Sequence, residues 1–116
     1  MTKRVQWRKL KHYVYAYVDP RSDEVFYIGK GTGNRAIKHL TDEKESTKKA
    51  KIDELTKLGF NPQIEIIRYG IENDEEAKKV EAACIDVIGI ENLTNQIKGK
   101  GSNPMVEKNL MRLQQY

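Results

Sequence analysis

The sequence predicts an α+β fold in which helices flank a small, three-stranded, mainly antiparallel sheet, in the order β-β-α-α-β-α-α. Two segments rich in strand-forming residues lie on either side of a short turn, as in a β-hairpin. A third such segment follows much later, between stretches that carry helix start and stop signals. The length of 116 residues favours a single domain.

A β-hairpin is expected near the N-terminus. Residues 13–18, YVYAYV, form its first strand, and residues 25–28, VFYI, return beside it. Residues 19–23, DPRSD, are typical of a turn, because Pro fixes φ and Asp bonds back to the backbone. Residues 1–11 hold five basic side chains and no acidic one, which predicts a ragged basic arm.

A glycine-rich loop and two helices follow the hairpin. The loop, residues 29–34, precedes a short helix over residues 34–40, for which Asn34 is a suitable N-cap. A second helix is expected over residues 48–58, where Gly59 ends it. The loop matches neither the dinucleotide-binding fingerprint nor the P-loop, so it is either a phosphate cradle or a plain turn.

The third strand and the longest helix come next. The strand is expected over residues 63–69, after which Gly70 turns the chain. Either Asn73 or Asp74 would cap a helix that ends near Ile88.

The C-terminal segments are less regular. Residues 92–96 read as an irregular polar stretch, residues 99–102 as a flexible loop, and residues 107–115 as a terminal helix. We therefore divide the chain into a basic arm over residues 1–11, a main domain over residues 12–97, and a C-terminal loop and helix over residues 98–116 packed on the same domain.

Composition excludes several classes of protein. With 38% hydrophobic and 33% charged residues, the chain is neither disordered nor membrane-spanning, because no apolar run approaches the roughly 20 residues that a bilayer requires. Residues 1–4 do not resemble a signal peptide. A single cysteine, Cys84, builds no disulfide framework or zinc site, so we expect a cytoplasmic protein with a reduced thiol in its core.

The net charge of +4 is unevenly distributed. Residues 1–51 carry thirteen basic and six acidic side chains, a balance of +7, whereas residues 52–116 carry eight and eleven, a balance of −3. A basic half favours a polyanionic partner through steering and counterion release, although many basic proteins bind no anion.

Arg35 and His39 are candidates for phosphate chemistry. Their spacing of four residues places both on one helix face above the glycine loop. A guanidinium holds phosphate oxygens with its fork, and an imidazole transfers protons near neutral pH. The alternative is a solvated helix face with an incidental arginine and histidine. His12 reads as incidental, and Asn95 reads as a turn former or as a group that holds a loop.

Glu81 is the candidate metal ligand. It falls in the apolar stripe that Ala77, Cys84 and Ile88 define on the long helix, where a carboxylate is costly unless a cation compensates it. A single hard oxygen ligand suits Mg²⁺, which keeps most of its waters and uses substrate phosphates. The alternative is a glutamate at the edge of the stripe that reaches solvent.

Taken in order, these residues resemble the signature of the GIY-YIG nucleases. Residues 13–15, YVY, and residues 27–29, YIG, are similar to its two halves, although Tyr13 stands where the motif has glycine. The resemblance covers about residues 12–97 and continues through Lys30, Arg35, His39, Glu81 and Asn95.

One subgroup of that family is especially similar. Residues 29–35, GKGTGNR, and residues 92–96, NLTNQ, resemble the subgroup typified by the LEM-domain animal nucleases, which includes small stand-alone microbial proteins. The spacing from Gly29 to Arg35 is shorter than in repair and homing members but suits this subgroup.

The resemblance implies a role for each residue. Tyr15 would be the general base, helped by the positive charge of Lys30 and the metal, because an unperturbed phenol has a pKa of roughly 10. Tyr27 would position water or phosphate, and His39 would assist proton movement. Glu81 would bind the metal, and Arg35 would hold the phosphate. Gly29 and Gly31 would let the backbone approach the substrate closely, and Asn95 would orient another group or bind the substrate.

The resemblance thus implies an endonuclease that hydrolyses DNA with Mg²⁺, or Mn²⁺ in its place, with weak sequence specificity and selectivity for branched structures. DNA is the expected partner and no membrane is involved; the oligomeric state, monomer or transient dimer, is open. Two alternatives stand beside this one: a catalytically silent DNA-binding module, and a nuclease subunit that a partner protein targets. Repair, mobile-element propagation and defence all use this chemistry.

Overall fold

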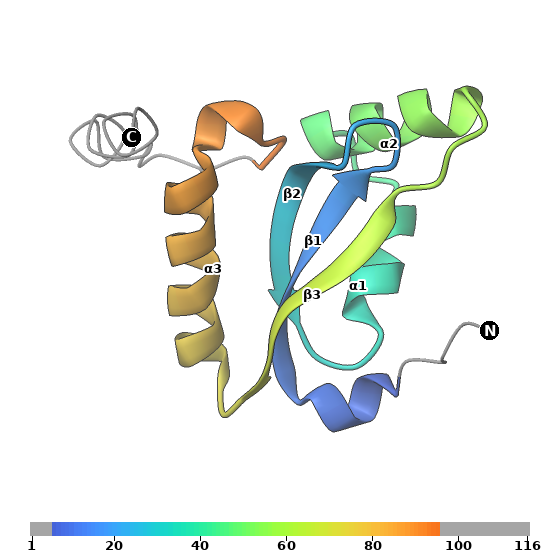
Figure 1. Cartoon of the computed structure of the whole chain (residues 1–116). Coiled ribbons are helices and arrows are strands. Elements are labelled where there is room, and N and C mark those ends of the chain that lie inside the picture. The colour runs from blue at the N-terminus through green and yellow to red at the C-terminus, as the bar shows by residue number, and fades with distance from the viewer. Residues whose placement is uncertain (1–5, 96–116) are drawn as a thin grey trace.

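The computed structural model describes residues 6–95, which form one antiparallel sheet with helices on both faces (Figure 1). The sheet order is β2-β1-β3, so that β1 is central and β2 is an edge strand. The strands are β1, His12–Asp19; β2, Glu24–Gly31; and β3, Gln63–Ile71. The predicted α+β class with a three-stranded antiparallel sheet is therefore confirmed.

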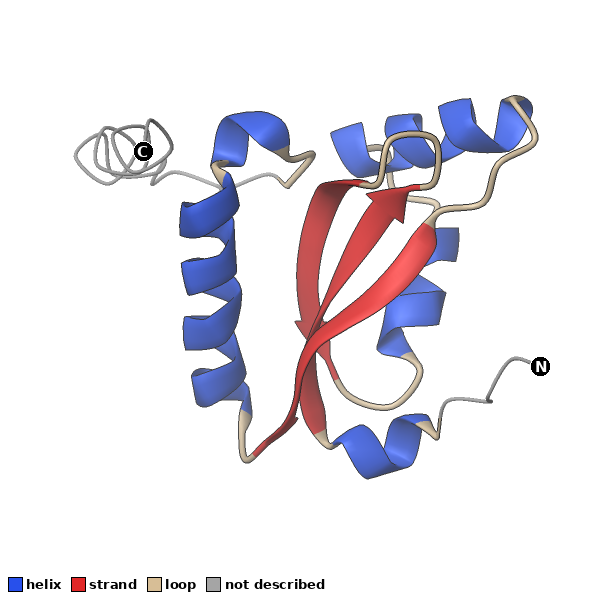
Figure 2. Ribbon diagram, in the orientation of Figure 1, coloured by secondary structure: helices blue, strands red, loops and turns tan. Residues whose placement is uncertain are grey.

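The helices lie on opposite faces of the sheet, as Figure 2 shows. They are α1, Arg35–Lys38; α2, Thr47–Lys57; α3, Asp74–Ile88; and the 3-10 turns η1, Trp7–Leu10, η2, His39–Thr41, and η3, Ile90–Asn92. Ser46 caps α2 by accepting a hydrogen bond from the backbone of Lys49, and Asn73 caps α3 in the same way from Glu76. In the described part of the chain, every helix is too short or too polar to cross a membrane.

Alternation along β1 divides the core into two halves. Odd-numbered side chains, led by Tyr15, pack with α1 and α2, whereas even-numbered ones, led by Val14, pack with α3. Members of the first half are Tyr13, Tyr15, Tyr17, Phe26, Ala36, Ile52 and Leu55, and members of the second are Val14, Ala16, Ile28, Ile71, Ala77 and Ile85. Because β2 is an edge strand, side chains from both faces of the sheet come together beside it.

All three strands are longer than the sequence predicts, and β2 exceeds its expected range the most. Strand β2 runs through Gly29 to Gly31, where a loop was expected to begin, because these glycines pair with Tyr15 and Tyr13 on β1. Strand β3 likewise runs past the expected turn at Gly70 to Ile71. Glycine therefore marks close packing in β2 rather than the end of the strand.

The helical predictions also change in detail. The helix expected over residues 34–40 is split into α1 and η2, and the side chain of Asn34 makes no capping hydrogen bond. Residues 7–10 form η1, and Trp7 packs on the tyrosine half of the core, so this part of the expected ragged arm is ordered. The expected loop over residues 99–102 and helix over residues 107–115 lie outside the described residues.

Candidate active site

A cavity of about 350 Å³ lies around edge strand β2. It draws side chains from both faces of the sheet, from α1 and η2 on one side and from α3 on the other. Its lining residues are His12, Tyr15, Tyr27, Lys30, Gly31, Thr32, Arg35, His39, Asp74 and Glu81. All six residues predicted to be catalytic thus meet in one place, whereas Gly29 and Asn95 lie outside the lining.

The two glycines of β2 make room for reactive side chains. A Cβ atom on Gly29 would lie 2.5 Å from both the Cζ and the hydroxyl of Tyr15, its cross-strand neighbour. A Cβ atom on Gly31 would lie 2.7 Å from the Cβ and Cγ of Arg35. In this structure the glycines therefore permit the approach of Tyr15 and Arg35, while their approach to substrate remains a prediction.

Two flanking tyrosines fix the position of the Arg35 backbone. The Tyr13 hydroxyl donates to the carbonyl of Gly33 at 2.6 Å and accepts from the N–H of Ala36 at 3.1 Å. The Tyr17 hydroxyl donates to the carbonyl of Ala36 at 2.6 Å. Tyr13, which departs from the glycine of the signature, thus ties the start of α1 to the sheet.

The hydroxyls of Tyr15 and Tyr27 converge on His39. They lie 2.8 and 3.2 Å from its Nδ1 atom. The Nε2 atom lies 3.8 Å from a carboxylate oxygen of Asp42, which favours the tautomer with the proton on Nε2. Nδ1 then accepts a hydrogen bond from Tyr15.

Burial sets the protonation states of this group. It lowers the pKa of His39 to about 4, and the nearby charges of Lys48 and Arg35 add to the effect, so the imidazole is neutral at pH 7. Burial also raises the pKa of Tyr15, and it raises the pKa of Tyr27 to about 12. Both phenols are therefore protonated, and Tyr15 is poised to donate to a neutral imidazole.

The ammonium of Lys30 lies apart from Tyr15, Tyr27 and His39. Its Nζ atom donates to Asp74 at 2.7 Å, on the face of the sheet that α3 covers. Lys30 was expected to help Tyr15, but the Tyr15 hydroxyl makes its hydrogen bond with His39. Lys30 instead neutralises the second carboxylate of the cavity.

Arg35 is exposed and makes no ion pair among the residues that the structure describes. It lines the same cavity as Tyr15 and Tyr27, and its positive charge opposes the effect of burial on the pKa of both phenols. A guanidinium without a carboxylate partner beside a polar cavity is available to an incoming phosphate.

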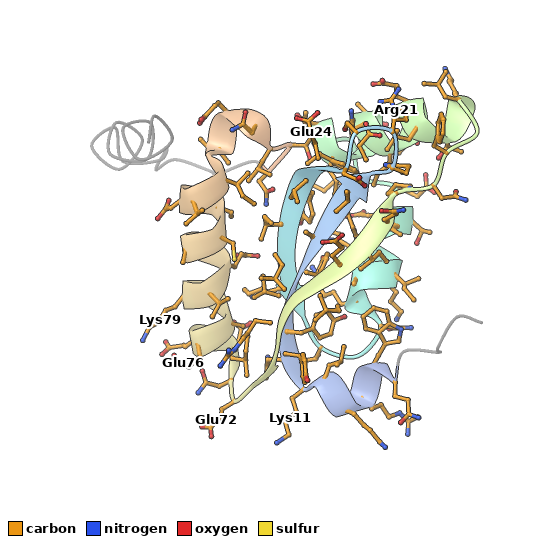
Figure 3. All side chains as sticks on the ribbon, viewed as in Figure 1. Lys11, Arg21, Glu24, Glu72, Glu76 and Lys79 are labelled. Atoms are coloured by element: carbon orange, nitrogen blue, oxygen red, sulfur yellow. The ribbon has the colours of Figure 1, made fainter. Side chains whose placement is uncertain are left out.

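Glu81, on α3, lines the cavity. Glu76 and Lys79, by contrast, lie on the outer side of the same helix (Figure 3). Glu81 forms no ion pair within residues 6–95, and burial raises the pKa of its carboxyl against the opposing effect of Lys30. A single half-buried carboxylate in a polar cavity is a ligand that Mg²⁺ accepts when water and phosphate complete its shell.

A metal site made by the protein alone is not present between residues 6 and 95, where no three histidine, cysteine or acidic side chains gather. An Mg²⁺ ion at Glu81 would therefore take its remaining ligands from water and substrate phosphate.

Asn95 holds the free edge of β2. Its side-chain oxygen accepts from the N–H of Ile28 at 2.9 Å, and its amide donates to the carbonyl of Ile28 at 2.6 Å. Thr94 bonds the carbonyl of Phe26 through its backbone and its hydroxyl, at 2.7 and 2.9 Å. These contacts support the loop-holding role of Asn95, and its contact with substrate stays a prediction.

Sequence reasoning missed three residues of the cavity, namely His12, Thr32 and Asp74. His12 was taken as incidental, although it directly precedes Tyr13, which pairs with Gly31. Asp74 precedes Glu81 by seven residues on one helix, a spacing that places both on the same face. This seven-residue spacing is the feature of the sequence that could have identified Asp74.

Comparison with known proteins supports the resemblance. Residues 19–116 match the family described as the LEM-3-like GIY-YIG domain, a match that begins after Tyr15. A curated protein from Caenorhabditis elegans, "Ankyrin repeat and LEM domain-containing protein 1 homolog", is 36% identical over 87 residues. That alignment covers 66% of this chain but 12% of the relative.

No solved structure matches the chain. The family match nevertheless extends over most of the chain and includes the second half of the signature, Arg35, His39, Glu81 and Asn95. GIY-YIG proteins form a family of nucleases that are generally metal-dependent. The chain belongs to the family of LEM-3-like GIY-YIG domains.

Proposed function

We propose that the protein is an endonuclease that hydrolyses DNA phosphodiester bonds with Mg²⁺, or with Mn²⁺ in its place. It would select branched DNA structures and have weak sequence specificity. One observation carries this proposal. The same cavity is lined by a hydrogen-bonded tyrosine–histidine pair and by a guanidinium, of Arg35, and a carboxylate, of Glu81, that form no ion pair within residues 6–95.

Arg35 would bind the scissile phosphate. Its fork matches two non-bridging oxygens, and no carboxylate in the described part of the chain competes for it. The charge on those oxygens grows as water attacks, so Arg35 stabilises the transition state more than the ground state.

Tyr15 would act as the base through His39. As water attacks phosphorus, its proton passes to the Tyr15 oxygen while the Tyr15 proton passes to Nδ1 of His39. No free phenolate forms, which removes the difficulty of a phenol whose pKa burial raises. Binding of the DNA phosphate supplies negative charge nearby, which raises the pKa of His39 and strengthens it as the final proton acceptor.

Tyr27 and Glu81 would complete the site. The Tyr27 hydroxyl lies 3.2 Å from the same Nδ1 atom and would orient the attacking water. Glu81 would hold the Mg²⁺ ion, which supplies Lewis-acid stabilisation to the scissile phosphate and to the leaving 3′ oxygen. Lys30 keeps Asp74 paired, so that of the two carboxylates in the cavity Glu81 is the one without an ion pair in the described part of the chain.

The test is cleavage of supercoiled plasmid and of a four-way DNA junction by the full chain in Mg²⁺. We expect nicked plasmid and resolved junction with the wild type, and at least a hundredfold slower cleavage with Arg35→Ala, because positioned charge stabilisation contributes about 10²–10³ in rate. Lys57→Ala, which removes a positive charge at the far end of α2, is the matched control.

The silent binding module is the competing function. It would be favoured if wild type and Arg35→Ala were equally inert on every substrate while both bound DNA. A targeted subunit would show cleavage only when a partner protein is added.

A further inference from the structure

A second cavity, of about 330 Å³, adjoins the first. Tyr27, Arg35 and His39 line both cavities, so that Arg35 lies between them. The second cavity extends along the segment that links α1 to α2, which lies on the tyrosine side of the sheet (Figure 1).

The two cavities differ in charge. In the first, the cations Lys30 and Arg35 are balanced by Asp74 and Glu81. In the second, three cations face one carboxylate, Asp42. The first cavity thus suits a metal with a phosphate, and the second suits a phosphate alone.

Lys48 makes this surplus of positive charge unusual, because it is a lysine with only 5% of its surface exposed. Its Nζ atom donates to the carbonyl of His39 at 2.7 Å and lies 3.9 Å from a carboxylate oxygen of Asp42. The ring of Tyr27 lies below it, with its centroid 5.4 Å from Nζ. One backbone carbonyl, one distant carboxylate and one aromatic ring compensate a buried ammonium only partly. A bound anion would complete the compensation.

Lys44 supplies an exposed cation at the same cavity. It forms no ion pair within residues 6–95. Arg35 also has no ion pair among the residues that the structure describes, so the cavity is bordered by two cations without such a pair there and by the buried Lys48.

We propose that the second cavity binds the phosphate next to the scissile one on the same DNA strand, with Lys44 and Lys48 as its cations. This proposal rests on the proposed nuclease function, because it assigns the scissile phosphate to the first cavity. Arg35 joins the two subsites, so one strand passing over Arg35 places successive phosphates in neighbouring cavities.

The test measures the salt dependence of DNA binding by the full chain in EDTA, where no cleavage occurs. A fluorescent four-way junction is titrated at several salt concentrations, and the variants are Lys44→Ala and Lys57→Ala. Lys44 is exposed, so its replacement does not disturb the fold, and Lys57 is an equally exposed lysine outside both cavities.

We expect Lys44→Ala to lower the slope of log K against log salt by about 0.9, which corresponds to about fivefold weaker binding at 0.15 M salt. Lys57→Ala should match the wild type, and Lys44→Arg should restore the wild-type slope.

The outcomes separate the two proposals. If Lys44→Ala binds with the same slope as Lys57→Ala, the subsite is wrong, whether or not the protein cuts DNA. If Lys44→Ala shows the smaller slope but the wild type does not cleave DNA in Mg²⁺, the second cavity binds a DNA phosphate, whereas the nuclease function fails and with it the place of that phosphate beside a scissile one. Absence of DNA binding by the wild type would overturn both.

Discussion

Replacing Gly29 by alanine should abolish catalysis by displacing Tyr15. The new Cβ would lie 2.5 Å from the Cζ and hydroxyl of Tyr15, well inside van der Waals contact. The Tyr15 ring cannot move away easily, because the Tyr13 and Tyr17 rings lie on either side with centroids 5.9 and 5.3 Å distant. The 2.8 Å contact between Tyr15 and His39 should therefore be lost.

Two magnitudes follow from this clash. Overpacking a core by one methyl group costs about 1–3 kcal/mol of stability. Loss of a positioned general base costs about 10²–10⁴ in rate. We therefore expect a lower melting temperature and, at a temperature where the variant is folded, single-turnover cleavage of DNA that is at least a hundredfold slower.

Gly70→Ala is the matched control. Gly70 has φ +71° and open space around its Cα, so alanine there strains the backbone without touching the cavity. It should lose about 1 kcal/mol of stability and keep its cleavage rate. A Gly29→Ala protein that is folded and cuts as fast as Gly70→Ala would refute the packing argument for Tyr15.

Three further predictions concern single groups. Tyr15→Phe should bind DNA as tightly as the wild type but cut it about 10²–10⁴ more slowly, measured by anisotropy and single-turnover cleavage; equal cleavage would exclude Tyr15 from proton transfer. Folding lowers the pKa of His39 from 6.5 to about 4, so the unfolded chain binds a proton at a higher pH than the folded chain does. The stability that His39 contributes is therefore fully present above pH 6.5 and is lost as the pH falls toward 4. Denaturant unfolding at several pH values should show this acid loss in the wild type and a smaller one in His39→Gln. Asn95→Ala should lower the free energy of unfolding by about 1–3 kcal/mol, because the backbone of Ile28 loses both its partners; an unchanged melting temperature would contradict the role of Asn95 at the strand edge.

The sequence predicted the identity of the elements better than their ends. Strand β1 was recognisable from its run of tyrosines and valines, and the two caps, Ser46 and Asn73, are residues that favour helix starts. The end of β2 was misplaced, because Gly29 reads as a turn residue when the ring of Tyr15 above it is unknown. Such packing is a property of the paired strands, not of either segment alone.

The candidate site was predicted as a set of residues, but its pairings were not. Lys30 was expected to help Tyr15, yet the alternation of β2 directs it to the opposite face, where it meets Asp74. The sequence gives no sign that Lys48 is buried, because its partners, the carbonyl of His39, the carboxylate of Asp42 and the ring of Tyr27, lie on other elements. These pairings depend on how separate elements meet in space.

The central claim is that Glu81 holds the metal of a hydrolytic site, and the Mg²⁺ dependence of DNA cleavage tests it most directly. Wild type and Glu81→Gln would be compared on one junction substrate, in single turnover, over a series of Mg²⁺ concentrations. We predict a saturable rise in rate for the wild type and no more than about 1% of that rate for Glu81→Gln at every concentration, since loss of the metal ligand removes several kcal/mol of transition-state stabilisation. A Glu81→Gln protein that reaches the wild-type rate at the same Mg²⁺ concentration would contradict the account.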